Sequence, residues 1–195
     1  VLQMHQALAD ACRHFGIDVL PFQKEVEKLK NDPQTKKMQQ KLAKTEQIEL
    51  NLRKGYIEAI ENKTIEWWKN EIGLLRERAK GKAPLQAEYC ERLLNFLSMM
   101  TYMYCEKYLK NKQVREAGKI VALYEILTPQ NPDMFYSKAA LNALQKNNDT
   151  AIQYLNKAIE LGFSDTTKLY ADDYFDKLSK KQSFQRLIDK MGNSP

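Results

Sequence analysis

Few residues of this chain have the type and spacing that catalysis requires. The two histidines, His5 and His14, are nine residues apart, which is about two and a half turns of a helix, so they face opposite sides. A thiol beside an imidazole can be activated, but Cys12 and His14 diverge because they lie only two positions apart. The pair Asp172 and Asp173 is typical of a helix start. Because phosphate-binding glycine loops and the HExxH and GxSxG motifs are also absent, we expect no enzyme and no catalytic residues.

The cysteines do not suggest a metal site or a disulfide framework. Cys12, Cys90 and Cys105 form no CxxC pair and leave one cysteine over in any pairing scheme. Each is expected to pack as a small apolar residue. The sequence therefore predicts neither a metal nor another cofactor.

The net charge of +6 is spread along the chain. Basic and acidic residues number 11 and 9 in residues 1–63, 11 and 8 in residues 64–131, and 9 and 8 in residues 132–195. The densest basic stretch, Lys36 to Lys54, holds six positive and two negative residues and no aromatic residue. A solvated helix face explains this stretch better than a phosphate-binding strip, so nucleic acid is not an expected partner.

The start of the chain and its longest apolar stretch bear on the cellular compartment and on membrane insertion. The chain begins at Val1, without a basic start followed by an apolar run. We expect a processed or truncated form, and a removed targeting segment would favour a periplasmic or exported protein over a cytoplasmic one. The longest apolar stretch, Leu93 to Cys105, is interrupted by polar residues and is shorter than the roughly 20 residues of a membrane span.

The elements that must position any site are predicted to be helices throughout. Leucine and alanine far outnumber valine and isoleucine, and strand-type alternation is absent. One helix is expected from Leu2 to Phe15, and a second from Phe22 that buries Phe22, Val26 and Leu29. A long amphipathic helix is expected from about Lys36 to Asn62, with one apolar face formed by Met38, Leu42, Ile48, Leu52, Tyr56 and Ile60.

Two adjacent tryptophans follow that helix. Thr64 is expected to cap the next helix, and Trp68 lies on its apolar stripe. Trp67 lies on a second face with Leu74. It is expected either to pack against the preceding helix or to be partly exposed as a second contact residue. A further helix, starting at about Pro84, is apolar nearly all round from Leu93 to Leu109, which predicts burial on several sides.

A fixed shift along the chain aligns two of its segments. Small residues coincide with small residues, large apolar residues with large ones, and turns with turns. The coincident positions are Cys105 with Ala139, Ala117 with Ala151, Val121 with Leu155, Leu127 with Leu161, and Asn111-Lys112 with Gln145-Lys146.

This period resembles the tetratricopeptide repeat, a helix-turn-helix unit of about 34 residues. Over residues 98–192 the chain is similar to repeat proteins of Bacteroidetes-type bacteria, with units at 98–131 and 132–165 and capping helices after them. The resemblance implies an all-α fold of antiparallel helical hairpins stacked as a short right-handed superhelix. Residues 1–97 match poorly and would form about four helices packed on the repeats. In the first unit Tyr124 replaces a small residue, which implies a splayed helix pair or a side pocket.

The resemblance also implies a concave groove that holds a peptide or a partner helix. The groove would be lined by Met99, Tyr102, Glu106, Lys110, Asp133, Tyr136 and Ala140. Tyrosine suits such a surface, although Tyr102 and Tyr136 could instead be core residues or be covered by the N-terminal helices. The lysine and asparagine that bind acidic chaperone tails in this family are missing from these positions. The neighbouring Lys138 and Asn142 are expected on a solvated face.

The sequence thus predicts a noncatalytic protein-protein interaction module whose partner is a protein or peptide of unknown identity. The alternative is a structural, self-associating protein in which the helix Lys36–Asn62 packs against its own copy as a homodimer. Weak nucleic-acid binding through Lys36–Lys54 is a distant third hypothesis.

Overall fold

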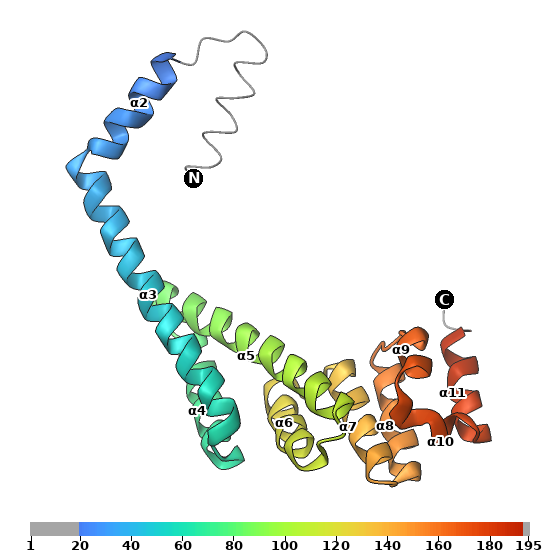
Figure 1. Ribbon diagram of the computed structural model, residues 1–195. Coiled ribbons are helices and arrows are strands. Elements are labelled where there is room, and N and C mark those ends of the chain that lie inside the picture. The colour runs from blue at the N-terminus through green and yellow to red at the C-terminus, as the bar shows by residue number, and fades with distance from the viewer. Residues whose placement is uncertain (1–19, 193–195) are drawn as a thin grey trace. The chain divides into compact units, whose positions relative to one another are not determined.

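Every regular element that the structure describes is a helix, and the prediction of an all-α fold is confirmed (Figure 1). The computed structural model describes residues 20–192. Packing divides the chain into two units, residues 1–54 and 55–195, and the boundary falls inside α3. The elements are α2 (Leu20–Asn31), α3 (Pro33–Asn62), α4 (Ile65–Ala79), α5 (Pro84–Lys110), α6 (Val114–Leu127), α7 (Pro132–Leu144), α8 (Asn148–Glu160), α9 (Thr166–Ala171), the 3-10 helix η1 (Asp173–Phe175), α10 (Asp176–Ser179) and α11 (Gln182–Gly192).

The described part of the first unit comprises α2 and α3 as far as Lys54. The two helices separate at Asp32, whose carboxylate accepts a hydrogen bond from the Thr35 N–H at 2.7 Å. Pro33 then occupies the first turn of α3, where its missing N–H is not needed. The expected helix Leu2–Phe15 and the expected burial of the Phe22 side chain lie outside what the structure describes.

The apolar side chains of this unit are exposed in the described residues. Leu29 is 57% exposed, so the prediction that it is buried is wrong; α2 makes no substantial packing contact with another described helix. The long amphipathic helix is present as predicted, but its apolar face is uncovered over four residues: Met38, Leu42, Ile48 and Leu52.

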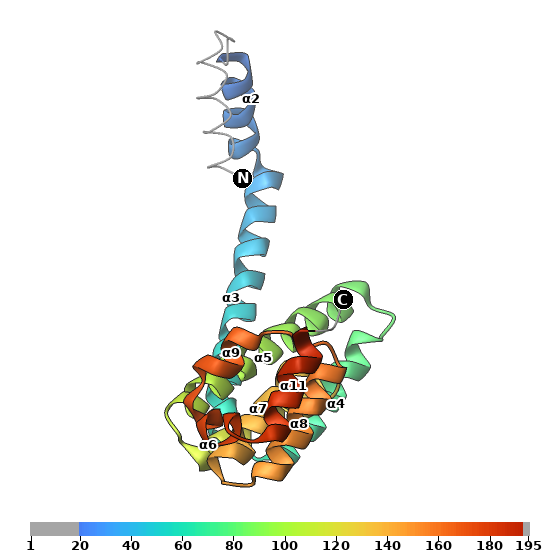
Figure 2. The same cartoon turned by 90° about the vertical axis from the view of Figure 1, so that its right-hand side faces the viewer.

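The second unit is built from helices that pack on their neighbours in the chain (Figure 2). α4 packs on α5, α5 on α6, and α7 on α8, and the short turns between them make each pair antiparallel. α6 also contacts α7, which joins the hairpins into one stack. The Arg76 guanidinium fastens α4 to the end of α6 by donating to the backbone carbonyls of Ile126 at 2.7 Å and Leu127 at 3.0 Å.

The turns of the two hairpins α5-α6 and α7-α8 have the same geometry, one repeat period apart. Each turn contains a lysine with positive φ, Lys112 at 53° and Lys146 at 65°. The Lys112 N–H donates to the backbone carbonyl of the third residue before it at 2.9 Å, and the Lys146 N–H makes the same hydrogen bond at 3.0 Å. The N–H groups of the next residues, Gln113 and Asn147, each donate to the backbone carbonyl of the fifth residue before them, at 2.9 and 2.8 Å. The backbone therefore repeats with the period found in the sequence.

The interior of the second unit follows the same period. Cys105 and Ala139 are both fully buried, as are Ala117 and Ala151. Small residues at these positions let neighbouring helices approach closely. The predicted start of the first repeat at residue 98 lies inside α5, which runs without interruption from Pro84 to Lys110.

The C-terminal segment covers the last hairpin. η1 packs on α7 and α11 packs on α8. Five apolar side chains of this segment are buried, namely Leu169, Phe175, Leu178, Phe184 and Leu187. The segment thus provides the last helical face with an apolar cover.

No helix within residues 20–192 combines the length and the apolarity that crossing a bilayer requires.

Candidate functional site

One face of α5 carries the first set of predicted groove residues. Met99, Tyr102, Glu106 and Lys110 follow one another at three- and four-residue steps, which places them on one side of a helix. Met99 is 53% exposed and Met103, on the same side, is 55% exposed. Tyr102 and Glu106 are half-buried, and Lys110 is exposed with its Nζ 3.9 Å from the Glu106 carboxylate. We call Met99, Tyr102, Met103 and Glu106 the α5 strip.

Lys168, from α9, closes one end of the α5 strip. Its Nζ lies 2.8 Å from Glu106 Oε1 and donates to the Tyr102 hydroxyl at 3.2 Å. The same ammonium group lies 5.2 Å from the Tyr102 ring centroid and 4.8 Å from that of Tyr136, so it also makes cation-π contacts. Burial acts to lower the pKa of Lys168, but Glu106 and Tyr102 outweigh it and raise this pKa above its ordinary value. A lysine of the chain's own C-terminal segment is therefore held, charged, where the resemblance implies ligand binding.

Tyr136 is a core residue rather than an exposed groove residue. Its side chain is fully buried, stacked on Phe163 at 4.7 Å between ring centroids and edge-on to Phe175 at 5.5 Å. Its hydroxyl donates to Asp172 Oδ2 at 2.5 Å, and the Tyr174 hydroxyl donates to the same oxygen at 2.5 Å. The expectation that Tyr136 is exposed is wrong, because residues 163–175 fold back over it. The alternative that Tyr136 is a core residue is therefore the one that holds, and the cover comes from the C-terminal segment, which was not anticipated.

The ionisation of these tyrosines follows from their surroundings. Burial, together with Tyr174 and the Asp172 carboxylate, raises the pKa of Tyr136 far above its ordinary value. Burial and the hydrogen bond to Asp172 raise the pKa of Tyr174 in the same way. Both hydroxyls therefore remain protonated donors to one carboxylate.

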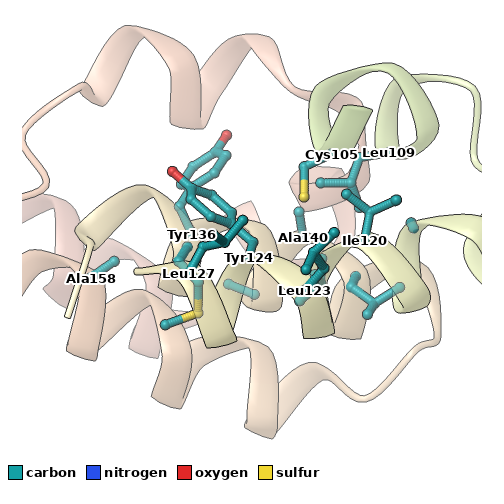
Figure 3. Close-up of a cluster of buried hydrophobic side chains, with 14 of the residues drawn as sticks. Cys105, Leu109, Ile120, Leu123, Tyr124, Leu127, Tyr136, Ala140 and Ala158 are labelled. Atoms are coloured by element: carbon teal, nitrogen blue, oxygen red, sulfur yellow. The ribbon is translucent and has the colours of Figure 1, made fainter. Parts of the chain in front are cut away.

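Ala140 and Asp133 complete the predicted second half of the groove. Ala140 is fully buried within the cluster of buried side chains shown in Figure 3, so it too is not a contact residue. Asp133 is half-buried in the first turn of α7, where its N–H donates to the capping side chain of Asn131 at 2.8 Å. The predicted groove is thus reduced to its α5 half and Asp133.

Tyr124 is accommodated inside the first repeat. It is 2% exposed and makes an edge-on contact with Tyr102, with 6.4 Å between ring centroids. Because Tyr124 supports the Tyr102 ring from the core side, it orients the one tyrosine that remains on the α5 strip.

Lys138 is not on a solvated face, and that prediction is wrong. Its ammonium forms an ion pair with Glu125 at 2.5 Å and lies 5.2 Å from the Tyr154 ring centroid. Asn142 donates to the Lys138 carbonyl at 2.8 Å. Lys138 is therefore paired with the neighbouring hairpin and Asn142 with its own helix, and they are not arranged to receive the carboxylate of a partner.

Of the two descriptions predicted for Trp67, partial exposure is the one the structure bears out, and a contact role stays a prediction. Trp67 is half-buried and edge-on to Trp68 with 5.0 Å between ring centroids, and the Lys63 ammonium lies 5.6 Å from its ring centroid. Trp68 itself is 1% exposed. The pair therefore leaves part of one indole at the surface.

The described residues contain no cluster of possible metal ligands. Within residues 20–192, no three histidine, cysteine, aspartate or glutamate residues are placed to hold a metal ion. Cys90 and Cys105 are buried free thiols, as expected, and burial raises the pKa of Cys105 to about 12. Cys12, His5 and His14 lie outside the described residues.

Comparison of the chain with protein-family models, with curated proteins and with solved structures gave no match.

Proposed function

We propose that this protein is a noncatalytic interaction module of the tetratricopeptide type that binds a peptide or a partner helix along the α5 strip. Support for the family comes from the two hairpin turns, which have similar φ angles at Lys112 and Lys146 and the same hydrogen bonds around them. The observation that carries the binding proposal is the exposure of two large apolar side chains one helical turn apart, Met99 and Met103, beside Tyr102 on one face of α5.

The chemistry of the α5 strip suits an apolar helix face. Methionine side chains are flexible and polarisable, and they adapt to partners of different shape. Tyr102 adds a ring held in place by Tyr124 and Lys168. Since Lys168 already neutralises Glu106, the α5 strip favours a partner that contributes apolar side chains at three- and four-residue spacing.

The α5 strip can be tested by capture of a partner. We expect native protein to retain a partner from a lysate of the source organism and the Met99→Glu/Met103→Glu variant to lose it, because two carboxylates would be desolvated in the interface. Mass spectrometry identifies the partner, and circular dichroism checks that the variant is folded.

The control is Met38→Glu, which alters a methionine on α3 that is more exposed, at 72%. It should retain the partner that the α5 variant loses. Equal capture by native protein and the Met99→Glu/Met103→Glu variant would contradict binding at the α5 strip.

A second candidate function is self-association through α3. It is favoured by the uncovered apolar face of Met38, Leu42, Ile48 and Leu52, which are 44–72% exposed. A helix with such a face can pack against a second copy of itself. Sedimentation velocity should then show a mass that rises with concentration and is reduced by Met38→Glu/Leu42→Glu. A native chain that stays monomeric throughout the micromolar range would exclude this function.

A further inference from the structure

One part of the C-terminal cover is a short segment held at both of its ends. We call residues 164–171, which include α9, the α9 strap. Just before it, the Phe163 ring stacks on Tyr136 with 4.7 Å between ring centroids. Just after it, the Asp172 carboxylate accepts hydrogen bonds from the Tyr136 and Tyr174 hydroxyls. The α9 strap can therefore move away from the repeats without release of these two anchors.

Few contacts hold the α9 strap between its anchors. Within it only Leu169 is buried, at 2% exposed. Tyr170 contacts the Phe184 ring edge-on at 6.5 Å but is 56% exposed. Among the described elements, α9 packs closely on η1 alone. Segments with so few buried contacts open with less free energy than the whole domain needs to unfold.

The polar attachment of the α9 strap is the Lys168 ammonium group, which occupies a site built by two repeats. α5 provides the Glu106 carboxylate at 2.8 Å and the Tyr102 hydroxyl at 3.2 Å, and α7 provides the Tyr136 ring, whose centroid lies at 4.8 Å. A carboxylate beside aromatic faces is a favourable environment for an ammonium ion. Lys110 approaches the other Glu106 oxygen only at 3.9 Å, with a side chain that is 65% exposed. We call Tyr102, Glu106 and Tyr136 the ammonium site.

The ammonium site continues the α5 strip. Tyr102 and Glu106 belong to both, and each lies three residues after one of the two exposed methionines on the same face of α5. Without Lys168, the Glu106 carboxylate, which is 18% exposed, would lose its closest cation. A partly buried charge without compensation is unfavourable. A ligand that brings its own ammonium group therefore fits the α5 strip once the α9 strap has opened.

We propose that the ammonium site binds a lysine side chain of the partner, and that the α9 strap inhibits this binding by placing Lys168 in the site. This proposal deepens the function proposed above and rests on it, because the partner lies along the α5 strip. The partner segment would carry its lysine one helical turn from its apolar side chains. Its binding displaces residues 164–171, while Phe163 and Asp172 hold the ends.

The first test is amide hydrogen exchange of the native protein in increasing urea. The N–H groups of Leu169 and Asp172 donate to carbonyls of the α9 strap, so their exchange reports its opening. They should exchange faster than the slowest amides of α8, and urea below the unfolding transition should change their exchange little, because local opening exposes little surface. Equal protection and equal urea dependence in the two segments would overturn the proposal, since the α9 strap would then open only with the whole domain.

The second test is binding of a synthetic peptide, measured by fluorescence anisotropy. The peptide copies residues 163–172 and carries a fluorescent label. Lys168→Met protein should bind it about thirtyfold more tightly than native protein does, because loss of the charged contact raises the open population by about that factor. A peptide with norleucine in place of its lysine should bind this variant about tenfold more weakly.

Matched variants show whether the peptide occupies the ammonium site. Glu106→Gln/Lys168→Met should bind the lysine and norleucine peptides equally. Lys157→Met, which changes an exposed lysine of α8, should bind as native protein does. The proposal is overturned if Lys168→Met protein binds no peptide, if it binds the lysine and norleucine peptides equally, or if it binds no better than native protein.

Failure of this proposal and failure of the proposed function give different results. Peptide tests that fail reject the ammonium site, but they leave partner capture through Met99 and Met103 intact. Equal capture by native protein and Met99→Glu/Met103→Glu rejects the α5 strip as the binding surface, whereas the peptide affinities do not depend on that result.

Discussion

Replacement of Lys168 by methionine should destabilise the protein by about 2 kcal/mol, although the residue lies in a short helix near the C-terminus. Its hydrogen bond to Glu106 joins two charged groups at 2.8 Å, and such bonds contribute about 1.5–3 kcal/mol. Contacts with the rings of Tyr102 and Tyr136 add about 0.5–1 kcal/mol each. Desolvation of the two side chains, which are 17% and 18% exposed, offsets part of this gain.

The assay is a double-mutant cycle followed by urea unfolding and far-ultraviolet circular dichroism. Lys168→Met and Glu106→Gln should each be destabilising, and the double variant should be less destabilised than their sum by about 1.5 kcal/mol, because each single change leaves its partner without compensation. Lys157→Met, which breaks the exposed pair Lys157-Glu160 at 3.5 Å, should cost less than about 0.5 kcal/mol. Additive single changes, or a Lys168→Met no worse than Lys157→Met, would refute the reasoning.

Three further predictions concern other contacts of the second unit. Arg76→Ala should lower the free energy of unfolding by about 1 kcal/mol in urea titrations, since the guanidinium donates to two carbonyls at the end of α6. In a Cys12→Ser variant, Cys90 and Cys105 should react with a thiol reagent only after unfolding, because both are buried and burial raises the pKa of Cys105 to about 12. The pKa values of Tyr136 and Tyr174 are higher in the folded protein than in the unfolded chain. Their contribution to the free energy of unfolding is therefore complete below about pH 10, and above it falls by about 1.4 kcal/mol per pH unit for each tyrosine. Tyr136→Phe should therefore flatten the alkaline fall in stability, and an unchanged pH profile would contradict this.

The helices of the second unit were predictable because their signals are local. Thr64 and Pro84 stand at the starts of α4 and α5, and the turns at Lys112 and Lys146 were aligned by the repeat period. The apolar stripe of α3 could also be predicted from the sequence. The exposure of this stripe could not, because periodicity indicates which side chains share a face but not whether another element covers that face.

The site depended on contacts that the sequence pattern does not encode. Lys168 reaches Glu106 across 62 residues, and Asp172 reaches Tyr136 across 36. In an open array of repeats, the repeat register would place Tyr136 in the lining of the groove. In this protein the C-terminal segment turns back and covers Tyr136. The resemblance did imply capping helices after residue 165, yet it could not indicate which polar side chains they would bring to Tyr102 and Glu106.

The cover over the last hairpin also limits how the stack can grow. A stack of helical hairpins has two open ends, and each bare apolar end can accept one more hairpin, from the same chain or from another molecule. Phe175, Phe184 and Leu187 fill the position that a next hairpin would take. Growth by end-to-end addition therefore stops at this end, and lengthening the array would require the new hairpin to be inserted before residue 163 rather than appended after residue 192.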